Sequence, residues 1–449
     1  MSGKNLPPNW AWVKLGDVCN KITDGTHFTP KYISSGVPFI SVKDIYNDKI
    51  HFENCKYISK SEHNVLIKRC NPEFGDVLIT KSGTIGRIAV VTNKKEFSLF
   101  VSVALLKPNK DLIDSNFLSM TLKNHINNID ISQTIKGGLL KNYHIEDIKA
   151  THIPLPSLSI QKSIVTKIEE LFSELDSGVA SLKKAKEQIK TYRQSVLASA
   201  FSGRLNRLNL DLPDSKINRI KTKNESGKSD NHVNQGSDNF SSELPAGWRW
   251  VKLGEAAYIN PKLPYADISN ETMVTFLPMK KVKELSGEFD LSEERKYSEV
   301  KKGFTPFTNG DVIFAKITPC MENGKIAVLN NLKNKIGFGS TEFHVFRTKE
   351  ELINQYLFYY LIQESFRGDA QHNMTGAVGQ KRVSRLFLEN SIIPLPSIKE
   401  QLQIIEEIEK RFSEADNLEK AIDESLAKAE TLRQSILKQA FEGRLVNEE

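Results

Sequence analysis

The chain has 449 residues, of which 39% are hydrophobic and 26% charged, and its formal net charge is +7. These proportions are typical of a soluble globular protein with two or three domains, and the lack of any run of eighteen apolar residues argues against a membrane span. The mild basic excess is compatible with a nucleic-acid partner without requiring one, and four cysteines without metal-ligand spacing, with an N-terminus that has no apolar signal segment, predict a reduced cytoplasmic protein.

Two tryptophans, Trp10 and Trp12, stand near the start of the chain in the stretch LPPNWAWVKLG. We interpret them, and Trp248 and Trp250 in a later copy of this stretch, as core anchors rather than as platforms that stack bases. The following stretch DGTHFTPKY contains His27, which has no second metal ligand near it in the sequence. We therefore interpret it as a hydrogen-bonded turn histidine.

Residues 74–91, FGDVLITKSGTIGRIAVV, predict two short strands around a Gly/Ser/Thr turn. A loosely similar stretch, NGDVIFAKITPCMENGKIAVL, occurs at 309–329, and INQYLFYYLIQESF predicts a helix over 353–366. Strands and helices of this kind in both halves of the chain predict two α+β modules.

Two long amphipathic helices are the clearest local feature of the sequence. Pro156 and Pro396 precede them, and Gly203 and Gly443 follow the last apolar positions as expected C-terminal stops. A helix of about 42 residues is a rod of roughly 60 Å, and this length favours pairing with another helix over packing on its own domain alone. Apolar residues recur every three or four positions at Ile160, Ile164, Ile168, Leu171, Leu175, Val179 and Leu182, and again at Ile404, Ile408, Phe412, Leu418 and Ile422.

Residues 218–243, in the stretch between the first helix and the second module, have only Ile220, Val233 and Phe240 as sizeable apolar residues. Such a segment cannot bury enough surface to order itself, so the stretch is predicted to be a flexible linker. The chain is thereby divided into five parts. These are a first module at 1–152, a first repeated helix at 153–205, the linker at 206–243, a second module at 244–392 and a C-terminal repeated helix at 393–449.

The chain is an internal duplication with similar ends and divergent middles. RQSVLASAFSGRL at 193–205 and RQSILKQAFEGRL at 433–445 agree at nine of thirteen positions. The IPLP stretches at 153–176 and 393–416 agree at thirteen of twenty-four, and the two copies are offset by the same amount as in the first pair. LPPNWAWVKLG agrees with LPAGWRWVKLG at eight of eleven. Two copies are too few for a solenoid, which needs three or more short units.

No catalytic or cofactor motif is found in the sequence. LPPNW does not fit the motif of adenine methyltransferases, no glycine-rich loop opens a helix after a strand, and neither GKS at 227–229 nor NGKIAV at 323–328 completes a phosphate-binding loop. The serine, histidine and aspartate residues show no triad spacing. We therefore predict that the chain has no catalytic site of its own.

Several stretches together closely resemble the specificity subunit of type I restriction-modification systems. They are DGTHFTPKY, GDVLITKSGTIGRIAVV, GGLLKNYHIEDIKATHIPLP and the two helices that run from IPLP to GRL. The resemblance covers nearly the whole chain apart from the linker. The second copy has no clean counterpart of DGTH, so the two modules are expected to touch DNA with different residues.

The resemblance implies an α+β fold in which two similar target-recognition domains are separated by two long helices that form an antiparallel coiled coil with pseudo-two-fold symmetry. It implies double-stranded DNA as a ligand, two modification subunits that methylate adenine N6, and restriction subunits that translocate DNA. S-adenosylmethionine, ATP and Mg would belong to these partners, and this chain would bind no cofactor. Similar helices around divergent modules indicate an asymmetric two-part target with one methylated adenine on each strand.

The residues that contact DNA are expected in loops of the two modules, where glycines let the backbone approach and cations meet phosphate. Gln380 is the candidate base reader. The predicted contacts are Lys81, Ser82, Thr84, Arg87, Lys136 and Lys141 in the first module and Lys316, Thr318, Lys325, Gln380, Lys381 and Arg382 in the second.

Two other functions are compatible with the sequence. The chain could be a self-contained DNA-modifying enzyme with a cryptic site, although the missing motifs weigh against this. It could also be a scaffold that binds only protein. Methyl transfer by the chain alone would indicate the enzyme, and DNA binding in a gel shift with partner subunits would exclude the scaffold.

Overall fold

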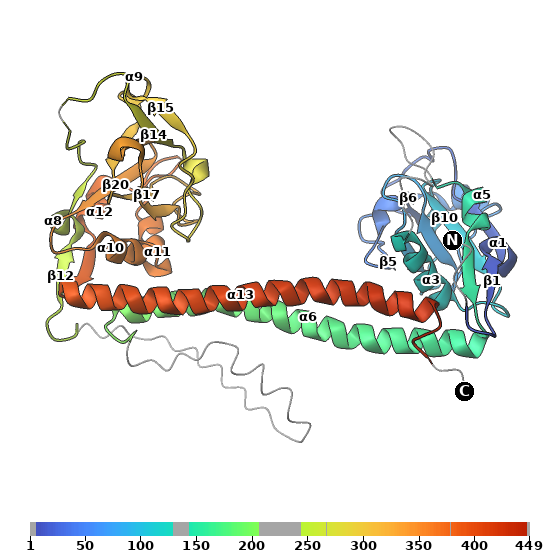
Figure 1. The fold of residues 1–449 in the computed structure, drawn as a ribbon. Coiled ribbons are helices and arrows are strands. Elements are labelled where there is room, and N and C mark those ends of the chain that lie inside the picture. Colours follow the sequence, from blue (N-terminus) through green and yellow to red (C-terminus); the bar gives the residue numbers. More distant parts are fainter. Residues whose placement is uncertain (1–5, 129–142, 206–243, 266, 378, 447–449) are drawn as a thin grey trace. The chain divides into compact units, whose positions relative to one another are not determined.

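The computed structural model describes residues 6–128, 143–205, 244–265, 267–377 and 379–446, and Figure 1 shows the order of its elements. The chain divides into two compact units. Unit 1 comprises Met1–Leu182 and Glu424–Glu449, and unit 2 comprises Lys183–Asp423. Each unit therefore contains one module and a part of each long helix.

The first module is built on a four-stranded antiparallel sheet in the order β2-β10-β7-β8. A smaller sheet, β6-β3-β9, contains one parallel pair, and β1 pairs with β11 to bring the two ends of the module together. The strands are β1 (Ala11–Lys14), β2 (Cys19–Asp24), β3 (Val37–Ile40), β4 (Ile45–Tyr46), β5 (Lys49–Ile50), β6 (Lys56–Ile58), β7 (Val77–Thr80), β8 (Ile88–Val90), β9 (Ser98–Leu99), β10 (Val103–Pro108) and β11 (His152–Leu155). The helices are α1 (Leu15–Val18), η1 (Val42–Asp44), α2 (Lys60–Leu66), α3 (Ser115–Asn128) and α5 (Ile145–Ala150).

The second module repeats this plan. Its main sheet has the order β13-β20-β17-β18, its second sheet the order β15-β14-β19-β16 with one parallel pair, and β12 pairs with β21. The strands are β12 (Arg249–Lys252), β13 (Ala257–Ile259), β14 (Met273–Leu277), β15 (Glu294–Lys296), β16 (Thr305–Thr308), β17 (Val312–Ala315), β18 (Ile326–Val328), β19 (Ile336–Gly339), β20 (Phe343–Thr348) and β21 (Ile392–Leu395). The helices are α8 (Leu253–Ala256), η4 (Met279–Lys281), α9 (Tyr297–Val300), η5 (Lys333–Lys335), α10 (Asn354–Leu361), α11 (Glu364–His372) and α12 (Arg385–Asn390).

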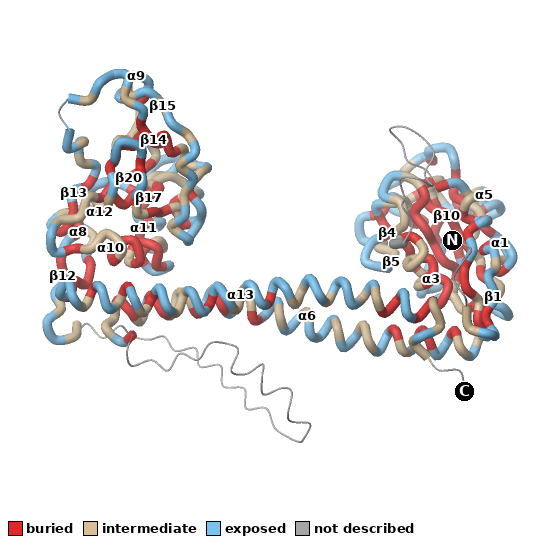
Figure 2. Tube along the Cα trace, viewed as in Figure 1, coloured by how far each residue is buried: buried red, intermediate tan, exposed pale blue. Residues whose placement is uncertain are grey.

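The two modules keep the same strand order although their sequences diverge between the ends. β10 and β20 occupy equivalent positions in the two copies of the repeat, and both lie second in the main sheet. Their residues are mostly buried (Figure 2), and in β10 Ala104 and Leu106 pack into one core cluster while Val103 and Leu105 pack into another. The α+β class predicted for both modules is confirmed.

The repeated helices are α6 (Leu158–Phe201) and α13 (Ile398–Phe441), and both contain 44 residues. They begin later than the predicted parts 153–205 and 393–449, because the IPLP stretches form β11 and β21. Gly203 and Gly443 lie just beyond the helices with φ of +70° and +71°, so they are C-terminal stops as predicted.

The helices pair antiparallel within each unit. In unit 2, Arg193 near the end of α6 donates to Asp416 in the first half of α13 at 2.6 Å and lies over the ring of Phe412. In unit 1, Arg433 near the end of α13 pairs with Asp176 and lies over Phe172. The two sets of contacts involve equivalent positions of the two copies, and they confirm the predicted antiparallel coiled coil with internal pseudo-two-fold repeat.

A buried glutamine joins each module to the helix that follows it. The Nε2 of Gln161 donates to the carbonyl oxygens of Leu112 and Pro156 at 2.9 Å, and its Oε1 accepts from the backbone N–H of Asp114 at 2.8 Å. Gln401 repeats the arrangement in the second module, with the carbonyl oxygens of Glu351 and Pro396 and the N–H of Ile353. Both glutamines are 0% exposed.

The prediction that all four tryptophans anchor the core was wrong for two of them. Trp10 is buried and Trp248 is half-buried, but Trp12 is 42% exposed and Trp250 is 51% exposed. β1 and β11 form a two-stranded sheet in which Val13 and its partner Ile153 face the core, which leaves Trp12 on the open face. The same holds for Trp250 on β12.

The predicted helix over 353–366 is interrupted. Gln363 has a non-helical backbone, with ψ of 139°, and occupies the N-cap position of α11, so α10 and α11 are separate helices. All four cysteines are free in the structure. Within the described ranges, no helix is both long and apolar enough to cross a membrane.

Candidate nucleic-acid interface

The loops that carry most of the predicted contacts follow equivalent strands. β7 is followed by residues 81–87 and β17 by residues 316–325. The first residue of each loop is a lysine whose backbone N–H continues the sheet. Lys81 N donates to Ser102 O at 2.8 Å, and Lys316 N donates to Glu342 O at 2.9 Å. The loop of the second module is the longer one, so the same frame supports different loops.

In the second module, the structure brings distant predicted residues together. The hairpin formed by the described residues 375–377 and 379–383 docks against the strand extension after β17, where Thr318 N donates to Lys381 O at 3.1 Å and Val383 N donates to Lys316 O at 2.9 Å. Five of the six predicted residues of this module therefore lie on one edge. Two of them, Gln380 and Lys381, are exposed on the hairpin.

Three of the other four predicted residues of the second module have side-chain partners within the protein, and the fourth, Lys316, is half-buried and makes backbone hydrogen bonds. Arg382 makes a bidentate pair with Glu342, at 2.9 Å and 2.8 Å, and this lowers the pKa of the Glu342 carboxyl. Thr318 donates to Glu322 at 2.9 Å, and Lys325 Nζ lies 3.4 Å from Met279 O. These contacts hold the loop and the hairpin in place. The guanidinium of Arg382 is thus used to position the hairpin and is not free to bind a DNA base or phosphate.

A buried histidine fixes the same hairpin to the sheet. His344 on β20 lies with Nε2 2.9 Å from Val383 O and Nδ1 3.0 Å from Asn260 Nδ2. The Oδ1 of Asn260 accepts from Val345 N, which sets the amide so that Nδ2 donates to the histidine. Burial lowers the pKa of His344, and the neutral ring with its proton on Nε2 satisfies both neighbours.

In the first module, Lys81 and Arg87 also serve the fold. Lys81 is 5% exposed and its Nζ lies 3.2 Å from Asp24 Oδ2. Arg87 Nη1 donates to the carbonyl oxygens of Val42 and Ile45, and thereby holds the segment around η1. Ser82 is half-buried.

Thr84, also predicted in this loop, is exposed. Lys136 and Lys141 lie outside the described residues. Tyr143, the first described residue after them, donates from its N–H to Lys81 O at 2.7 Å, the counterpart of the contact between Val383 and Lys316.

Asp24 is the centre of a cluster that the sequence did not single out. It lies at the end of β2 with 4% exposure, and its Oδ1 accepts from Arg69 Nη2 at 2.5 Å and lies 3.2 Å from His27 Nε2. Its Oδ2 faces Lys81. His27 is thus a hydrogen-bonded turn histidine, as predicted. The spacing of Asp24 and His27 in DGTH could have indicated this pair, but nothing local in the sequence points to Arg69.

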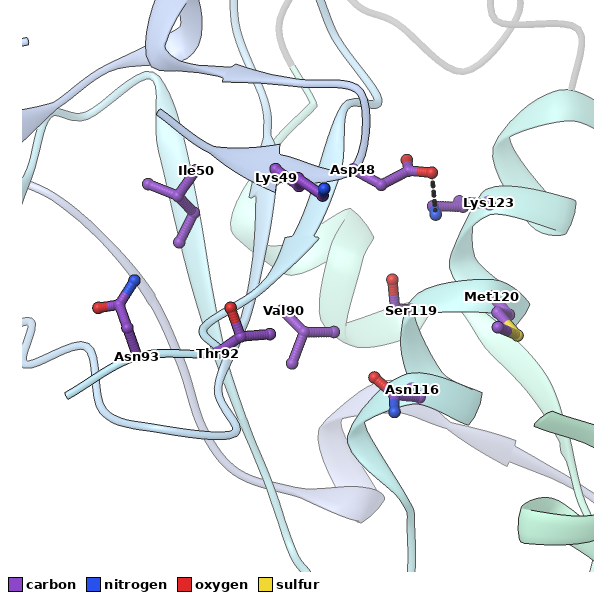
Figure 3. Close-up of a pocket in the computed structure, with 10 residues that line it drawn as sticks. All are labelled: Asp48, Lys49, Ile50, Val90, Thr92, Asn93, Asn116, Ser119, Met120 and Lys123. Carbon is purple, nitrogen blue, oxygen red and sulfur yellow. Dashed lines mark ion pairs between the residues drawn. The ribbon is translucent and has the colours of Figure 1, made fainter. Parts of the chain in front are cut away.

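A pocket of about 300 Å³ lies in the first module between β5, β8 and α3 (Figure 3). The ion pair of Lys123 with Asp48, at 2.8 Å, spans one side of it, and Ser119 and Asn116 on α3 line another. None of the predicted contacts within the described ranges lines it, so it is separate from the candidate interface. Among the residues that the structure describes, no group of three His, Cys, Asp or Glu side chains could hold a metal ion.

Comparison with known proteins gives a consistent set of similarities. Residues 7–191 and 245–428 each match the model of the "Type I restriction modification DNA specificity domain". The EcoAI specificity subunit of Escherichia coli is 43% identical over 199 residues, which are 43% of this chain and 33% of that protein. The chain thus aligns with only one third of the length of this relative.

Other similarities extend over the whole chain. The EcoKI specificity subunit of Escherichia coli K12 is 24% identical over 464 aligned residues, covering 99% of this chain and 91% of that protein. Among solved structures, the HsdS subunit from Thermoanaerobacter tengcongensis has a TM-score of 0.58 at 21% identity, covering 99% of both chains. This last similarity supports the fold alone.

Proposed function

The chain belongs to the family of type I restriction-modification DNA specificity subunits, with the family's domain present twice, and we propose that each domain reads one half of a two-part DNA target. Its function is therefore recognition within a larger complex. The target is asymmetric because the two modules differ, and each half is read by the loops of one module.

One observation carries this proposal. The modules share strand order, closing strands and helix junctions, whereas the loops after β7 and β17 differ in both length and sequence. The same fold with different loops is expected when the two modules bind two different DNA sequences in the same way. Base contacts specify sequence, and such contacts come from loop side chains.

The partners follow from the repeat. A protein that recognises a surface of the first copy finds a second, related surface in the other copy, as in a symmetric oligomer. We propose that the chain holds two methyltransferase subunits that modify adenine N6 and that restriction subunits join this assembly in the cytoplasm. S-adenosylmethionine, ATP and Mg would be bound by those subunits, and this chain would supply recognition and no catalysis.

The exposed predicted residues are the proposed contacts to DNA. Gln380 and Lys381 extend from a hairpin whose base is fixed by Arg382 and His344, so their backbone is held before DNA arrives. The Gln380 amide can bind adenine at two atoms. If Lys381 contacts a phosphate, its removal should make the slope of log K against log[salt] shallower by about one. Thr84 is the proposed contact in the loop after β7.

Exchange of modules tests the proposal. A hybrid in which residues 17–152 are replaced by the corresponding part of another family member should, with its modification subunit, methylate a motif changed in one half only. Exchange of residues 255–392 should change the other half, and the two hybrids serve as controls for each other. A change in both halves from a single exchange would contradict the division of labour between the modules.

A second experiment separates the proposal from a self-contained enzyme. The purified chain, given S-adenosylmethionine and DNA without any partner, should transfer no methyl groups. Addition of the modification subunit should restore transfer at the two-part motif. Transfer by the chain alone would show that it carries a catalytic site.

A further inference from the structure

The turn DGTH in the first module is held unusually firmly for a surface turn. A Cβ on Gly25 would lie 2.0 Å from Leu99 O, so only glycine permits this close approach of the two backbones. Thr26 N donates to Leu99 O at 2.9 Å, and Val101 N donates to Thr26 O at 3.0 Å. The turn is therefore tied to the segment between β9 and β10 on both sides.

The side chains beyond this turn are exposed yet fixed in position. Those of His27 and Arg69 are 58% and 56% exposed, but both meet the Oδ1 of Asp24, which is buried. Phe28, the next residue, is also 58% exposed, although a large apolar side chain gains by burial. An exposed cation, an imidazole and an aromatic ring in one small region are suited to bind nucleic acid.

Arg69 retains donors that can read a base. Its Nη2 is used by Asp24 and lies 3.2 Å from His27 Nε2, whereas Nε and Nη1 have no protein partner in the described part of the chain. An arginine presents five donors in a rigid planar fork, and two of them match the O6 and N7 acceptors of guanine in the major groove. The Nδ1 of His27 likewise has no protein partner among the described residues, since its contacts with Asp24 and Arg69 are made by Nε2.

The charges around Asp24 favour an anionic ligand. One carboxylate is shared by Arg69 and Lys81, so the cluster has an excess of positive charge before His27 is counted. Lys21 lies close as well, with Nζ 2.6 Å from Arg69 O.

The second module does not repeat this cluster in its described residues. At the equivalent end of β13 stands Asn260, whose amide is used by His344 and by Val345 N. A surface for a partner bound in two copies would be repeated in both modules. A surface found in one module alone is expected to serve the function in which the modules differ, and that function is recognition of a particular DNA sequence.

We propose that the DGTH turn and Arg69 are the base-reading element of the first module. Arg69 and His27 contact base edges of the first half-site in the major groove, and Phe28 makes an apolar contact with a neighbouring base or thymine methyl group. Asp24 is a positioning residue, because its buried carboxylate sets the orientation of both readers. This inference rests on the proposed function and names the residues that perform it in one half.

Arg69→Ala in the full chain, co-expressed with its modification subunit, is the primary test, with the methylated motif read from the host genome. Removal of a bidentate arginine should reduce discrimination at one base pair of the first half by about 10- to 100-fold and leave the second half unchanged. Lys60→Ala is the matched control, because Lys60 is an equally exposed cation of the same module and pairs with Glu96. His27→Ala should relax a neighbouring position.

Asp24→Asn tests the positioning role. It should relax the same base pair as Arg69→Ala, and at that base pair the double variant should be no less selective than Arg69→Ala alone, since there the aspartate acts through the arginine. If the variant does not fold, Arg69→Ala and His27→Ala still decide the proposal because both side chains are exposed.

The possible outcomes separate the alternatives. An unchanged motif with a normal two-part methylation pattern would overturn this inference while leaving the proposed function standing. Equal weakening on all sequences with a smaller salt slope would also overturn it, because that is the behaviour of a phosphate contact. Loss of the modification subunit from the purified complex would overturn it as well, by showing that the turn binds protein. Absence of any two-part motif with the unmodified chain would instead contradict the proposed function itself.

Discussion

Truncation of a single buried glutamine is expected to destabilise one unit severely. Gln161→Ala leaves the N–H of Asp114 and the carbonyl oxygens of Leu112 and Pro156 without their partner, in buried surroundings for Pro156 and part-buried surroundings for the other two. A buried polar group left unpaired costs about 1–3 kcal/mol, and the two part-buried groups add less because water can reach them, so we expect roughly 2–4 kcal/mol in total. That is a large share of the ~5–15 kcal/mol that stabilises a typical domain.

The duplication supplies a second measurement of the same quantity. Gln401→Ala removes equivalent contacts to Glu351, Ile353 and Pro396, so its effect on unit 2 should match the effect of Gln161→Ala on unit 1. Gln188→Ala, on the exposed side of α6, is the control and should change stability by less than about 0.5 kcal/mol.

Urea unfolding combined with hydrogen exchange of each unit is the suitable assay, because it reports local as well as global stability. Gln161→Glu should also be destabilising near neutral pH, since a carboxylate cannot donate to the two carbonyl oxygens. A loss below about 1 kcal/mol in both alanine variants would refute the reasoning, because even one unpaired buried group should cost that much. A clearly unequal loss in the two variants would refute it too, since the contacts removed are equivalent.

Three further predictions concern titration, thiol chemistry and helix pairing. Burial lowers the pKa of His344 in the folded chain, so as the pH falls the unfolded chain is protonated at this residue before the folded chain is. The free energy of unfolding should therefore fall as the pH drops below about 6.5, by at most ~1.4 kcal/mol per pH unit. His344→Gln should reduce that fall between pH 7.5 and 5.5, and an equal fall would exclude this histidine as its source. Burial raises the pKa of Cys19 and Cys70 to about 12, so mass spectrometry should find both almost unalkylated by iodoacetamide at pH 8 until urea is added, and rapid native labelling would contradict the burial of Cys70 and the half-burial of Cys19. Arg433→Ala should lower the free energy of unfolding by about 1–2 kcal/mol, because it removes an ion pair with Asp176 and a contact with the ring of Phe172. A double-mutant cycle with Asp176→Ala should assign at most ~1 kcal/mol to the ion pair. A larger coupling energy would argue against a solvent-screened contact.

The long helices were predictable because their determinants are local. Apolar residues at helical spacing, prolines ahead and glycines behind fix α6 and α13 to within a few residues, and Gly203 and Gly443 adopt the positive φ that such stops require. The repeat added what periodicity cannot give, since two copies of one helix are natural partners. The start of each helix was missed because IPLP pairs with the strand at the opposite end of its module, far away in the sequence.

The site was predictable in location but not in detail. The loop after β7 was identified, yet Lys81 and Arg87 turned out to hold neighbouring segments, because their partners Asp24 and Val42 are far away in sequence. The pairing of residues 316–318 with 381–383 depends on the path of the sheet, which no local pattern encodes. Trp12 was misjudged for a related reason, since a WxW pattern does not reveal which face of a two-stranded sheet is covered.

The unequal divergence of the chain follows from how the ends of the helices are used. The end of α6 lies in unit 2, where a side chain at Gly203 would overlap the ring of Pro245, and the end of α13 lies in unit 1, where one at Gly443 would overlap Pro7. Each helix end therefore fits against the start of the other module. Because each helix end fits against the other module, the two ends must match equivalent surfaces. A substitution at one helix end is therefore tolerated only if the module surface that it contacts can accommodate it. The buried residues of the two ends are accordingly the same or nearly the same, namely Val196, Leu197, Ala200 and Phe201 in α6 and Ile436, Leu437, Ala440 and Phe441 in α13.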